Sequence, residues 1–357
     1  MTTLFDRLPL GSLTLPNRIV MAPMTRARAT ADGLPTAAVA HYYAQRASAG
    51  LIVSEGNWPN PQGQSNPNTP GLYRDDQVAA WRPVTAAVHA NGGRIFAQLQ
   101  HAGRVGHPNI SGHTPVAPSP VALSAQLYTS AGMVPAPVPR ELSTAEVAGE
   151  VQGYAEAARR AIDAGFDGVE LHGANGYLIQ QFLSSNVNLR TDRYGGSVAG
   201  RIRFAVEVVQ AVAAAIGADR LGLRLSPGAH IWEIEEEHVS ELYTALLSEL
   251  APLGLAYVHL TATANDDLLL TLRRVWPGTL IVNPSNLMDP GATATDRATG
   301  DHWLAQGADL IAFGRAYLAN PDLVERLRAN LPLTPADSET YYAGGDQGYL
   351  NYTSHQH

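Results

Sequence analysis

The chain has 357 residues, of which 45% are hydrophobic, so it can bury a full core in one large α/β domain. Its formal net charge is −8, and the 24 Lys and Arg residues are scattered rather than clustered, which argues against nucleic acids and anionic membranes as partners. The sequence contains no cysteine, which excludes disulfides, thiolate nucleophiles and Cys-ligated iron–sulfur clusters.

Two further features bear on where the protein works. No apolar run approaches the roughly 18 residues that a membrane span requires. Residues 1–7 lack the basic-then-apolar order of a signal peptide. We therefore expect a cytoplasmic protein that acts on small molecules.

Short apolar runs recur along the whole chain. Residues 4–16 predict a hairpin, and eight runs that follow predict strands at residues 18–23, 51–56, 94–100, 168–172, 221–226, 257–261, 279–283 and 310–314. Most runs are continuous rather than alternating, which is typical of parallel strands covered on both faces. Between the predicted strands, apolar residues recur at the intervals of an amphipathic helix, for example over residues 147–162 and 239–250.

Eight strand–helix units predict a (β/α)₈ TIM barrel, in which reactive groups lie at the C-terminal ends of the strands. The alternative is a doubly wound open sheet, which would need a Gly-x-Gly-x-x-Gly turn after an early strand to hold a dinucleotide. No such turn is found, so the barrel is favoured. The hairpin at residues 4–16 would close the barrel floor, and we expect one domain over residues 1–357.

One stretch departs from the repeat. Prolines and serines crowd residues 108–140, after the third predicted strand, so a long helix is disfavoured there. This Pro-rich excursion lies on the side where the active site is expected. A lid and a decorated loop fit it equally well.

The segment His172-Gly-Ala-Asn-Gly-Tyr177 directly follows the fourth predicted strand and is the most informative in the chain. His172 and Asn175 would share a face if the chain begins to coil there, and both can donate hydrogen bonds to one oxygen. Tyr177 supplies a separate, weakly acidic phenol. Two neutral donors for a carbonyl and one proton donor suit the reduction of a polarised double bond.

These residues lie in segments that together resemble the old yellow enzyme family of flavin-dependent ene-reductases. The similarity runs nearly end to end, through residues 15–26, 97–104, 172–183, 190–197, 313–322 and 341–345. The resemblance implies a TIM barrel that binds flavin mononucleotide (FMN) non-covalently at its mouth. It also implies NAD(P)H as co-substrate, with NADPH favoured.

The resemblance assigns FMN contacts at several strand ends. Thr25 matches a hydroxyl that contacts the flavin O4, Gln98 an amide on the pyrimidine edge, and Arg224 a cation near N1, where charge develops on reduction. Gly314 and Arg315 follow the eighth strand, where barrels commonly bind phosphate. Further matching positions lie against the flavin in relatives, and these are Ala22, Pro23, Met24 and Gly56.

The implied reaction is the reduction of an α,β-unsaturated carbonyl or a similar activated alkene. His172 and Asn175 would hold the carbonyl oxygen while hydride reaches the β-carbon, and Tyr177 would protonate the α-carbon. The same oxygen site should bind phenolic ligands. Tyr342 matches an aromatic position near the active site.

The sequence departs from the family pattern at three places in the predicted site. Gln100 stands where many relatives have Trp, and Asn66 stands about where several have Tyr, so substrate contacts should differ. The segment 282–286 replaces a glycine-rich turn that contributes phosphate-binding N–H groups in relatives. Pro284 has no N–H, so we expect Asn283 to be a compensating donor.

Position 25 and the lack of cysteine sort the chain within the family. Thr25, rather than Cys, resembles the branch with pentaerythritol tetranitrate, N-ethylmaleimide and morphinone reductases.

No metal site is expected. Two alternatives stay open, namely a phosphate-substrate TIM-barrel lyase or isomerase, and an FMN- or phenol-binding barrel with little turnover. The oligomeric state is expected to be a monomer or a homodimer.

Overall fold

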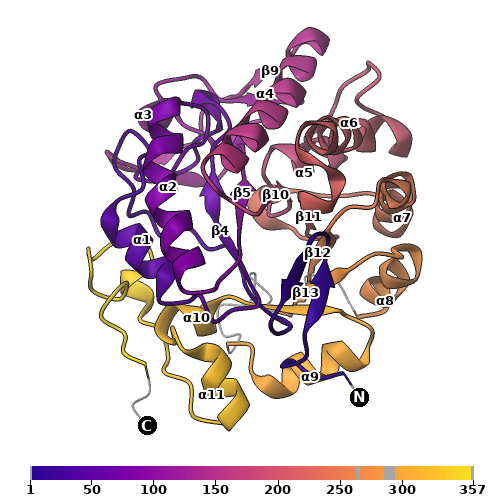
Figure 1. Cartoon of the computed structure of the whole chain (residues 1–357). Coiled ribbons are helices and arrows are strands. Elements are labelled where there is room, and N and C mark those ends of the chain that lie inside the picture. The colour runs from indigo at the N-terminus through magenta and orange to yellow at the C-terminus, as the bar shows by residue number, and fades with distance from the viewer. Residues whose placement is uncertain (1, 263–265, 285–293, 355–357) are drawn as a thin grey trace.

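The computed structural model describes residues 2–262, 266–284 and 294–354 and shows a closed barrel of eight parallel strands surrounded by helices (Figure 1). The barrel order is β3, β4, β5, β10, β11, β12, β13 and β14, and β14 pairs with β3 to close it. Every predicted strand is present. The strands span Ile19–Met21, Leu51–Asn57, Ile95–Leu99, Gly168–Gly173, Leu221–Leu225, Tyr257–Thr261, Leu280–Asn283 and Leu310–Phe313.

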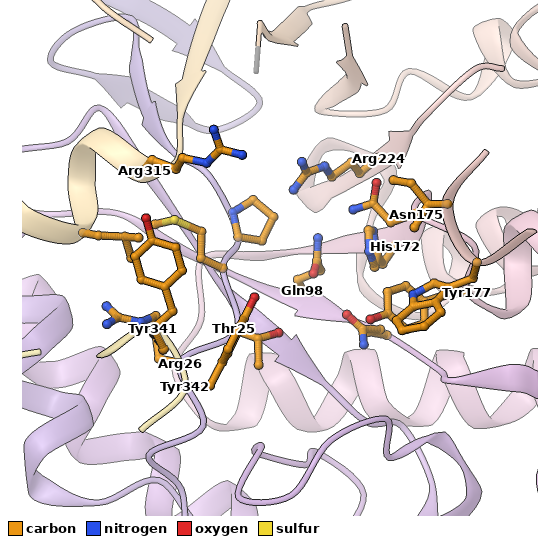
Figure 2. A pocket seen from close by; sticks show the side chains of 16 residues that line it. Thr25, Arg26, Gln98, His172, Asn175, Tyr177, Arg224, Arg315, Tyr341 and Tyr342 are labelled. Atoms are coloured by element: carbon orange, nitrogen blue, oxygen red, sulfur yellow. Dashed lines mark hydrogen bonds between the residues drawn. The ribbon is translucent and has the colours of Figure 1, made fainter. Parts of the chain in front are cut away.

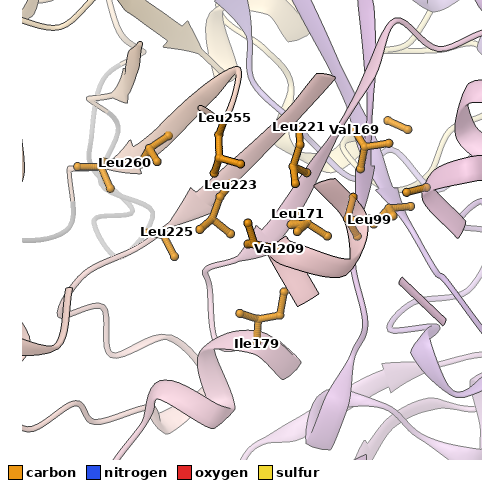
Figure 3. Packing of buried hydrophobic residues seen from close by; sticks show 14 of the residues in the cluster. Leu99, Val169, Leu171, Ile179, Val209, Leu221, Leu223, Leu225, Leu255 and Leu260 are labelled. Atoms are coloured by element: carbon orange, nitrogen blue, oxygen red, sulfur yellow. The ribbon is translucent and has the colours of Figure 1, made fainter. Parts of the chain in front are cut away.

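Side chains alternate between the two surfaces of the barrel wall, as strand geometry requires. Outward-facing residues pack against the surrounding helices. Figure 3 shows Leu171 and Leu223 of this cluster beside Val209 of α6 (Val198–Ile216) and Ile179 of α5 (Leu178–Leu183). Inward-facing residues near the floor form a second apolar cluster. It includes Phe96 and Tyr257, which are fully buried.

The N-terminal hairpin closes the floor, as predicted. Strands β1 (Leu8–Leu10) and β2 (Leu13–Leu15) pair antiparallel. Their residues Leu10 and Leu15 are buried in the inner floor cluster. The floor is therefore sealed by apolar packing, which leaves the opposite mouth for chemistry.

The helices follow the strands as a (β/α)₈ barrel requires. The longer ones are α1 (Ala37–Ala44), α2 (Asp75–Ala90), α4 (Thr144–Asp163), α6, α7 (Val239–Leu250), α8 (Asp266–Val275), α9 (Arg297–Ala305) and α11 (Leu323–Ala329). Helix α4 begins with a capping box, in which Ser143 accepts from the Glu146 N–H and the Glu146 side chain accepts from the Ser143 N–H. Among the described residues, no helix is long and apolar enough to cross a membrane.

The Pro-rich excursion contains only short elements, namely α3 (Pro108–Ser111), β6 (Val116–Ala117), β7 (Gln126–Thr129), β8 (Gly132–Pro135) and β9 (Arg140–Glu141). Strands β7 and β8 form an antiparallel hairpin. Residues Leu123 and Leu127 of the excursion pack with Val105 against Tyr177 and Trp232. The excursion therefore packs against Tyr177 and Trp232, two side chains at the barrel mouth.

A cluster that we term the arginine–tyrosine clamp holds the segment after α11 against the loop that follows β3. The Arg26 guanidinium donates to the Tyr341 carbonyl (3.1 Å), the Tyr42 hydroxyl (2.9 Å) and the Gly348 carbonyl (2.9 Å). The rings of Tyr42 and Tyr349 stack with their centroids 4.2 Å apart. The clamp fixes the position of residues 341–349 beside the barrel mouth.

Removal of the stacked ring should destabilise the protein. Tyr349 is fully buried, so we expect Tyr349→Ala to lower the free energy of unfolding by about 3 kcal/mol through the cavity that it leaves. Chemical denaturation measures this value. Tyr352→Ala is the matched control, because Tyr352 is half-buried and its hydroxyl accepts from the Asp337 N–H, so its loss should cost under about 1 kcal/mol. Equal losses would contradict a specific role of the stack.

Candidate active site

A cavity of about 390 Å³ opens at the C-terminal ends of the barrel strands (Figure 2). Its volume is within the range of about 300–1,000 Å³ that is usual for small-molecule sites. It is lined by Pro23, Met24, Thr25, Arg26, Gln98, Gln100, His172, Asn175, Tyr177, Arg224, Ile231, Trp232, Arg315, Leu318, Tyr341 and Tyr342. The side chains come from both ends of the sequence and from its middle.

Most of the predicted site residues meet at this one cavity. The exceptions are Ala22, Gly56, Asn66, Asn283 and Gly314, which do not line it. Gly314 lies near the cavity residue Met24 and near Ala22, because a Cβ built at Gly314 would lie 3.6 Å from the Met24 sulfur and 3.9 Å from the Ala22 Cβ.

The cavity also contains residues that the sequence analysis did not identify. These are Arg26, Ile231, Trp232, Leu318 and Tyr341. Arg26 and Tyr341 lay inside segments that carried the family resemblance, so those segments were a usable signal. No sequence pattern pointed to Ile231 or Trp232.

The turn between His172 and Asn175 is not helical, so the two side chains do not share a helix face as the sequence analysis considered. Asn175 has a left-handed backbone with a φ of 57°, and α5 begins only after Tyr177. Asparagine tolerates this conformation better than most residues. The Asn175 N–H donates to the Ser226 hydroxyl (2.8 Å), which anchors the turn. Figure 2 shows the His172 and Asn175 side chains adjacent on one side of the cavity.

His172 is neutral at physiological pH. Burial in the barrel, followed by repulsion from the charge of Arg224, lowers its pKa to about 3. Its Nδ1 atom and the Oδ1 atom of Asn175 are buried and have no hydrogen-bond partner among the described residues. A neutral imidazole and an amide with open hydrogen-bonding capacity therefore face one part of the cavity.

A fully buried carboxylate lies directly below this pair, at Glu170. It accepts hydrogen bonds from the Gln98 amide (2.8 Å), the His259 Nδ1 (2.9 Å) and the Tyr257 hydroxyl (3.1 Å). Burial would raise the pKa of Glu170, but attraction to His259 and its hydrogen bond, together with the charge of Arg224, hold it below the usual value. The ionised carboxylate thus fixes the orientation of Gln98 at the cavity floor.

Arg224 is also held from the side. It is 3% exposed, and its Nη2 atom donates to the Asn283 Oδ1 (3.1 Å). The Asn283 amide nitrogen donates to the Ala312 carbonyl (2.9 Å). Asn283 therefore braces Arg224 within the barrel wall and is not among the residues that line the cavity; its contact with a phosphate stays a prediction. Residues 285 and 286 of the altered turn lie outside the described part of the chain.

The residues present fit a flavin. The Nε atom of Arg224 is buried without a hydrogen-bond partner among the described residues, and it faces a cavity that also contains the Gln98 amide and the Thr25 hydroxyl. Arg315 begins α10 (Arg315–Ala319) on another side of the cavity (Figure 2). A cation beside a polar floor suits the pyrimidine ring of a flavin, and the second cation suits a phosphate.

Fold and site together define a flavin-dependent oxidoreductase built on a (β/α)₈ barrel. Residues 3–334 match the model of the NADH:flavin oxidoreductase / NADH oxidase family. The chain belongs to this family, and within it to the old yellow enzymes.

Similar proteins agree with this assignment. The old yellow enzyme homologue from Zymomonas mobilis is 40% identical, with a TM-score of 0.93 over 98% of this chain and 99% of that one. Morphinone reductase in complex with tetrahydroNAD is also 40% identical, with a TM-score of 0.93 over 100% and 98%. A probable flavin mononucleotide-dependent alkene reductase from Leishmania infantum is 40% identical over 96% of this chain and 94% of its own length.

The neutral state of His172 predicts how stability depends on pH. An unfolded histidine takes up a proton below its ordinary pKa of 6.5, whereas folded His172 does so only near 3. Its contribution is therefore complete above pH 6.5 and is lost as the pH falls below that value, by up to about 1.4 kcal/mol per pH unit. We expect His172→Gln to lose free energy of unfolding less steeply than wild type between pH 6.5 and about 5.

Chemical denaturation across this pH range measures the slope. The matched control is His113→Gln, which makes the same substitution at an exposed position. A slope for His172→Gln that runs parallel to wild type would show that folded His172 takes up its proton like an exposed histidine.

Proposed function

We propose that this protein uses NAD(P)H, with NADPH favoured, and bound FMN to reduce the C=C bond of α,β-unsaturated carbonyls and similar activated alkenes. The observation that carries the proposal is the meeting of His172, Asn175 and Tyr177 at one cavity with the flavin-compatible residues Gln98 and Arg224. The solved complex of morphinone reductase with tetrahydroNAD supports a nicotinamide as reductant. FMN, when bound, accepts hydride from the nicotinamide and supplies it to the alkene.

His172 and Asn175 bind and polarise the substrate carbonyl. As hydride arrives at the β-carbon, negative charge develops on the carbonyl oxygen, and donors placed beforehand stabilise it without reorganisation. The low pKa of His172 means that the imidazole is neutral, and the one N–H that a neutral imidazole carries can donate a hydrogen bond to the oxygen. The pair thus lowers the barrier for hydride transfer while the oxygen stays unprotonated.

Tyr177 supplies the proton to the α-carbon. Burial, and then the neighbouring Tyr342, raise the pKa of Tyr177 above its usual value, so the phenol holds its proton at neutral pH. Figure 2 shows Tyr177 on the side of the cavity next to His172 and away from Arg315. A protonated donor beside the carbonyl site can complete the reaction after hydride arrives.

The electrostatics of the floor serve the reduced cofactor. Arg224 would stabilise negative charge that develops on the flavin ring on reduction, and Glu170 keeps this arginine from being an isolated buried charge. Arg315 would bind the phosphate. The whole chain acts, in this proposal, as one FMN-binding domain in a monomer or homodimer, and its cytoplasmic location stays a prediction.

The observations disfavour the other functions considered. A phosphate-substrate lyase or isomerase usually uses a reactive lysine or paired carboxylates, and neither lines the cavity among the described residues. A barrel that only binds FMN or phenols would not need Tyr177 beside the carbonyl site. Turnover with an enone distinguishes that case.

The oxygen site predicts a spectral test. The purified protein should show flavin absorption bands. A phenol such as p-hydroxybenzaldehyde should add a long-wavelength charge-transfer band, because the neutral donors His172 and Asn175 favour binding of the phenolate above the flavin ring. His172→Ala should weaken this binding by about tenfold through the loss of one hydrogen bond to a charged oxygen. Equal affinity in wild type and variant would remove His172 from the oxygen site, and a protein that cannot take up FMN would refute the function.

Replacement of the proton donor should separate the two halves of the reaction. We expect Tyr177→Phe to retain FMN, phenol binding and flavin reduction by NADPH, but to slow the oxidation of the reduced flavin by cyclohexenone by about a hundredfold. Stopped-flow absorbance measures each half separately, and NADH in place of NADPH tests the favoured nicotinamide. Wild-type enone reduction by Tyr177→Phe would exclude its role as proton donor.

A further inference from the structure

Two adjacent glutamines of α5, Gln180 and Gln181, are hydrogen-bonded to the turn that carries Asn175 and Tyr177. Both are fully buried, and neither is among the residues that line the cavity. A buried amide side chain is normally paired at its donors and acceptors, because an unpaired polar group costs free energy when it is removed from water. The hydrogen bonds of the two glutamines therefore show which parts of the turn they hold.

Gln180 holds the N–H groups at the start of the turn. Its Oε1 atom accepts from the Gly176 N–H (2.8 Å) and from the Ser226 hydroxyl (3.0 Å), which itself accepts from the Asn175 N–H (2.8 Å). Its Nε2 atom donates to the Ser226 carbonyl (3.1 Å) and to the Glu236 carboxylate (3.1 Å). An amide side chain has two acceptor positions and two N–H groups, and all four are used here. Gln180 is thus bonded to one N–H of the turn directly and to the other through Ser226.

Gln181 holds the other side of the same glycine. Its Nε2 atom donates to the Gly176 carbonyl (2.9 Å) and to the Ala102 carbonyl (3.1 Å). Its Oε1 atom accepts from the Arg104 N–H (3.1 Å). The peptide group that contains the Gly176 carbonyl leads directly to Tyr177. Gln181 therefore fixes the backbone from which the phenol side chain extends.

Gly176 needs this support on both sides. Its φ is 77°, and glycine reaches this left-handed region as readily as it leaves it. A Cβ built at this position would lie 2.6 Å from the Ile231 carbonyl oxygen and 3.0 Å from the Trp232 Cβ, so a larger residue would clash with that loop. The turn thus requires a glycine, and the two glutamines restrict the rotation that this glycine would otherwise allow.

The direction of the Asn175 side chain depends on this backbone. Its Oδ1 atom is buried and has no hydrogen-bond partner among the described residues, so no contact at that atom fixes the amide. Figure 2 shows the Asn175 side chain near Arg224 and the Tyr177 side chain farther from it. The two side chains thus enter the cavity at different places, and each needs its own support.

We propose that Gln180 and Gln181 are positioning residues with separate tasks in the reaction. Gln180 sets the direction of the Asn175 amide, which binds the substrate oxygen. Gln181 sets the direction of the Tyr177 phenol, which supplies the proton. Groups that act on a substrate have to be held within about 0.5 Å of the productive geometry, and the two glutamines meet this need without touching the substrate. The inference rests on the proposed roles of Asn175 and Tyr177.

The affinity for a phenol tests the task of Gln180. The FMN-loaded protein would be titrated with p-hydroxybenzaldehyde. We expect Gln180→Met, which keeps the volume but removes the hydrogen bonds, to weaken binding by about threefold to tenfold. Gln181→Met should leave the affinity within about twofold of wild type. Gln77→Met is the matched control, because Gln77 is a fully buried glutamine of α2 whose side chain accepts from the N–H groups of Tyr73 and Arg74.

Enone reduction tests the task of Gln181. The oxidation of the reduced flavin by cyclohexenone, followed by stopped flow, should slow by about threefold to tenfold in Gln181→Met. If Gln181 acts through the phenol, the same substitution should have no further effect in a Tyr177→Phe background. By the same logic, Gln180→Met should not weaken phenol binding further in an Asn175→Ala background, but it should still slow enone reduction in Tyr177→Phe.

Equal effects of the two substitutions on phenol affinity would overturn the separate tasks. Losses as large in the Asn175→Ala and Tyr177→Phe backgrounds as in wild type would overturn positioning altogether. A wild-type phenol affinity in Asn175→Ala, or a wild-type enone rate in Tyr177→Phe, would instead overturn the roles on which the inference rests.

Two further variants serve if a Met variant does not fold or retain FMN. Ser226→Ala removes the hydroxyl that links Gln180 to the Asn175 N–H and should weaken phenol binding. Gln181→Glu keeps the shape and an acceptor for the Arg104 N–H but replaces the donor to the Gly176 carbonyl, and it should slow enone reduction. Wild-type values in these two variants would likewise overturn the proposal.

Discussion

The buried charge of Glu170 is the constraint around which the mouth of the barrel is organised. A carboxylate removed from water is stable only if it is paired and hydrogen-bonded, and Glu170 meets that requirement with Gln98 from β5 and His259 from β12. The positive charge of Arg224 on β11 lies near enough to favour its ionised form. Glu170 on β10 is thus joined to β5 and β12 by hydrogen bonds and attracts the charge on β11 between them. His172, two residues further along β10, inherits its inward direction from the same alternation.

The fold could be predicted from the sequence because it depends on repetition. Eight apolar runs covered by helices allow few architectures, and the hairpin at residues 4–16 had an obvious place at the floor. The location of the site followed, because parallel barrels place the C-terminal ends of their strands at one mouth. Thr25, Gln98, His172 and Arg224 could therefore be expected to meet from their places at strand ends, although their roles came from the family resemblance.

Other parts of the site could not be read from a linear pattern. The left-handed turn at Asn175 depends on a hydrogen bond to Ser226, 51 residues away. Trp232 reaches the cavity through a loop conformation that apolar periodicity does not encode. Asn283 shows the limit of analogy, since its neighbours in three dimensions, Arg224 and Ala312, give it a bracing role that its position in the sequence did not suggest. Such roles depend on long-range contacts between loops.

The arginine–tyrosine clamp has a consequence for the order in which the protein matures. Arg26 and Gly348 are 322 positions apart in the chain and meet through one hydrogen bond, and the barrel itself closes between β3 and β14. During synthesis the N-terminal part of the chain emerges first and begins to fold while the rest is still being made. The wall that carries Tyr341 cannot be fixed in place until residue 348 has left the ribosome. A nascent chain that still lacks residue 348 therefore has an open, unfinished mouth.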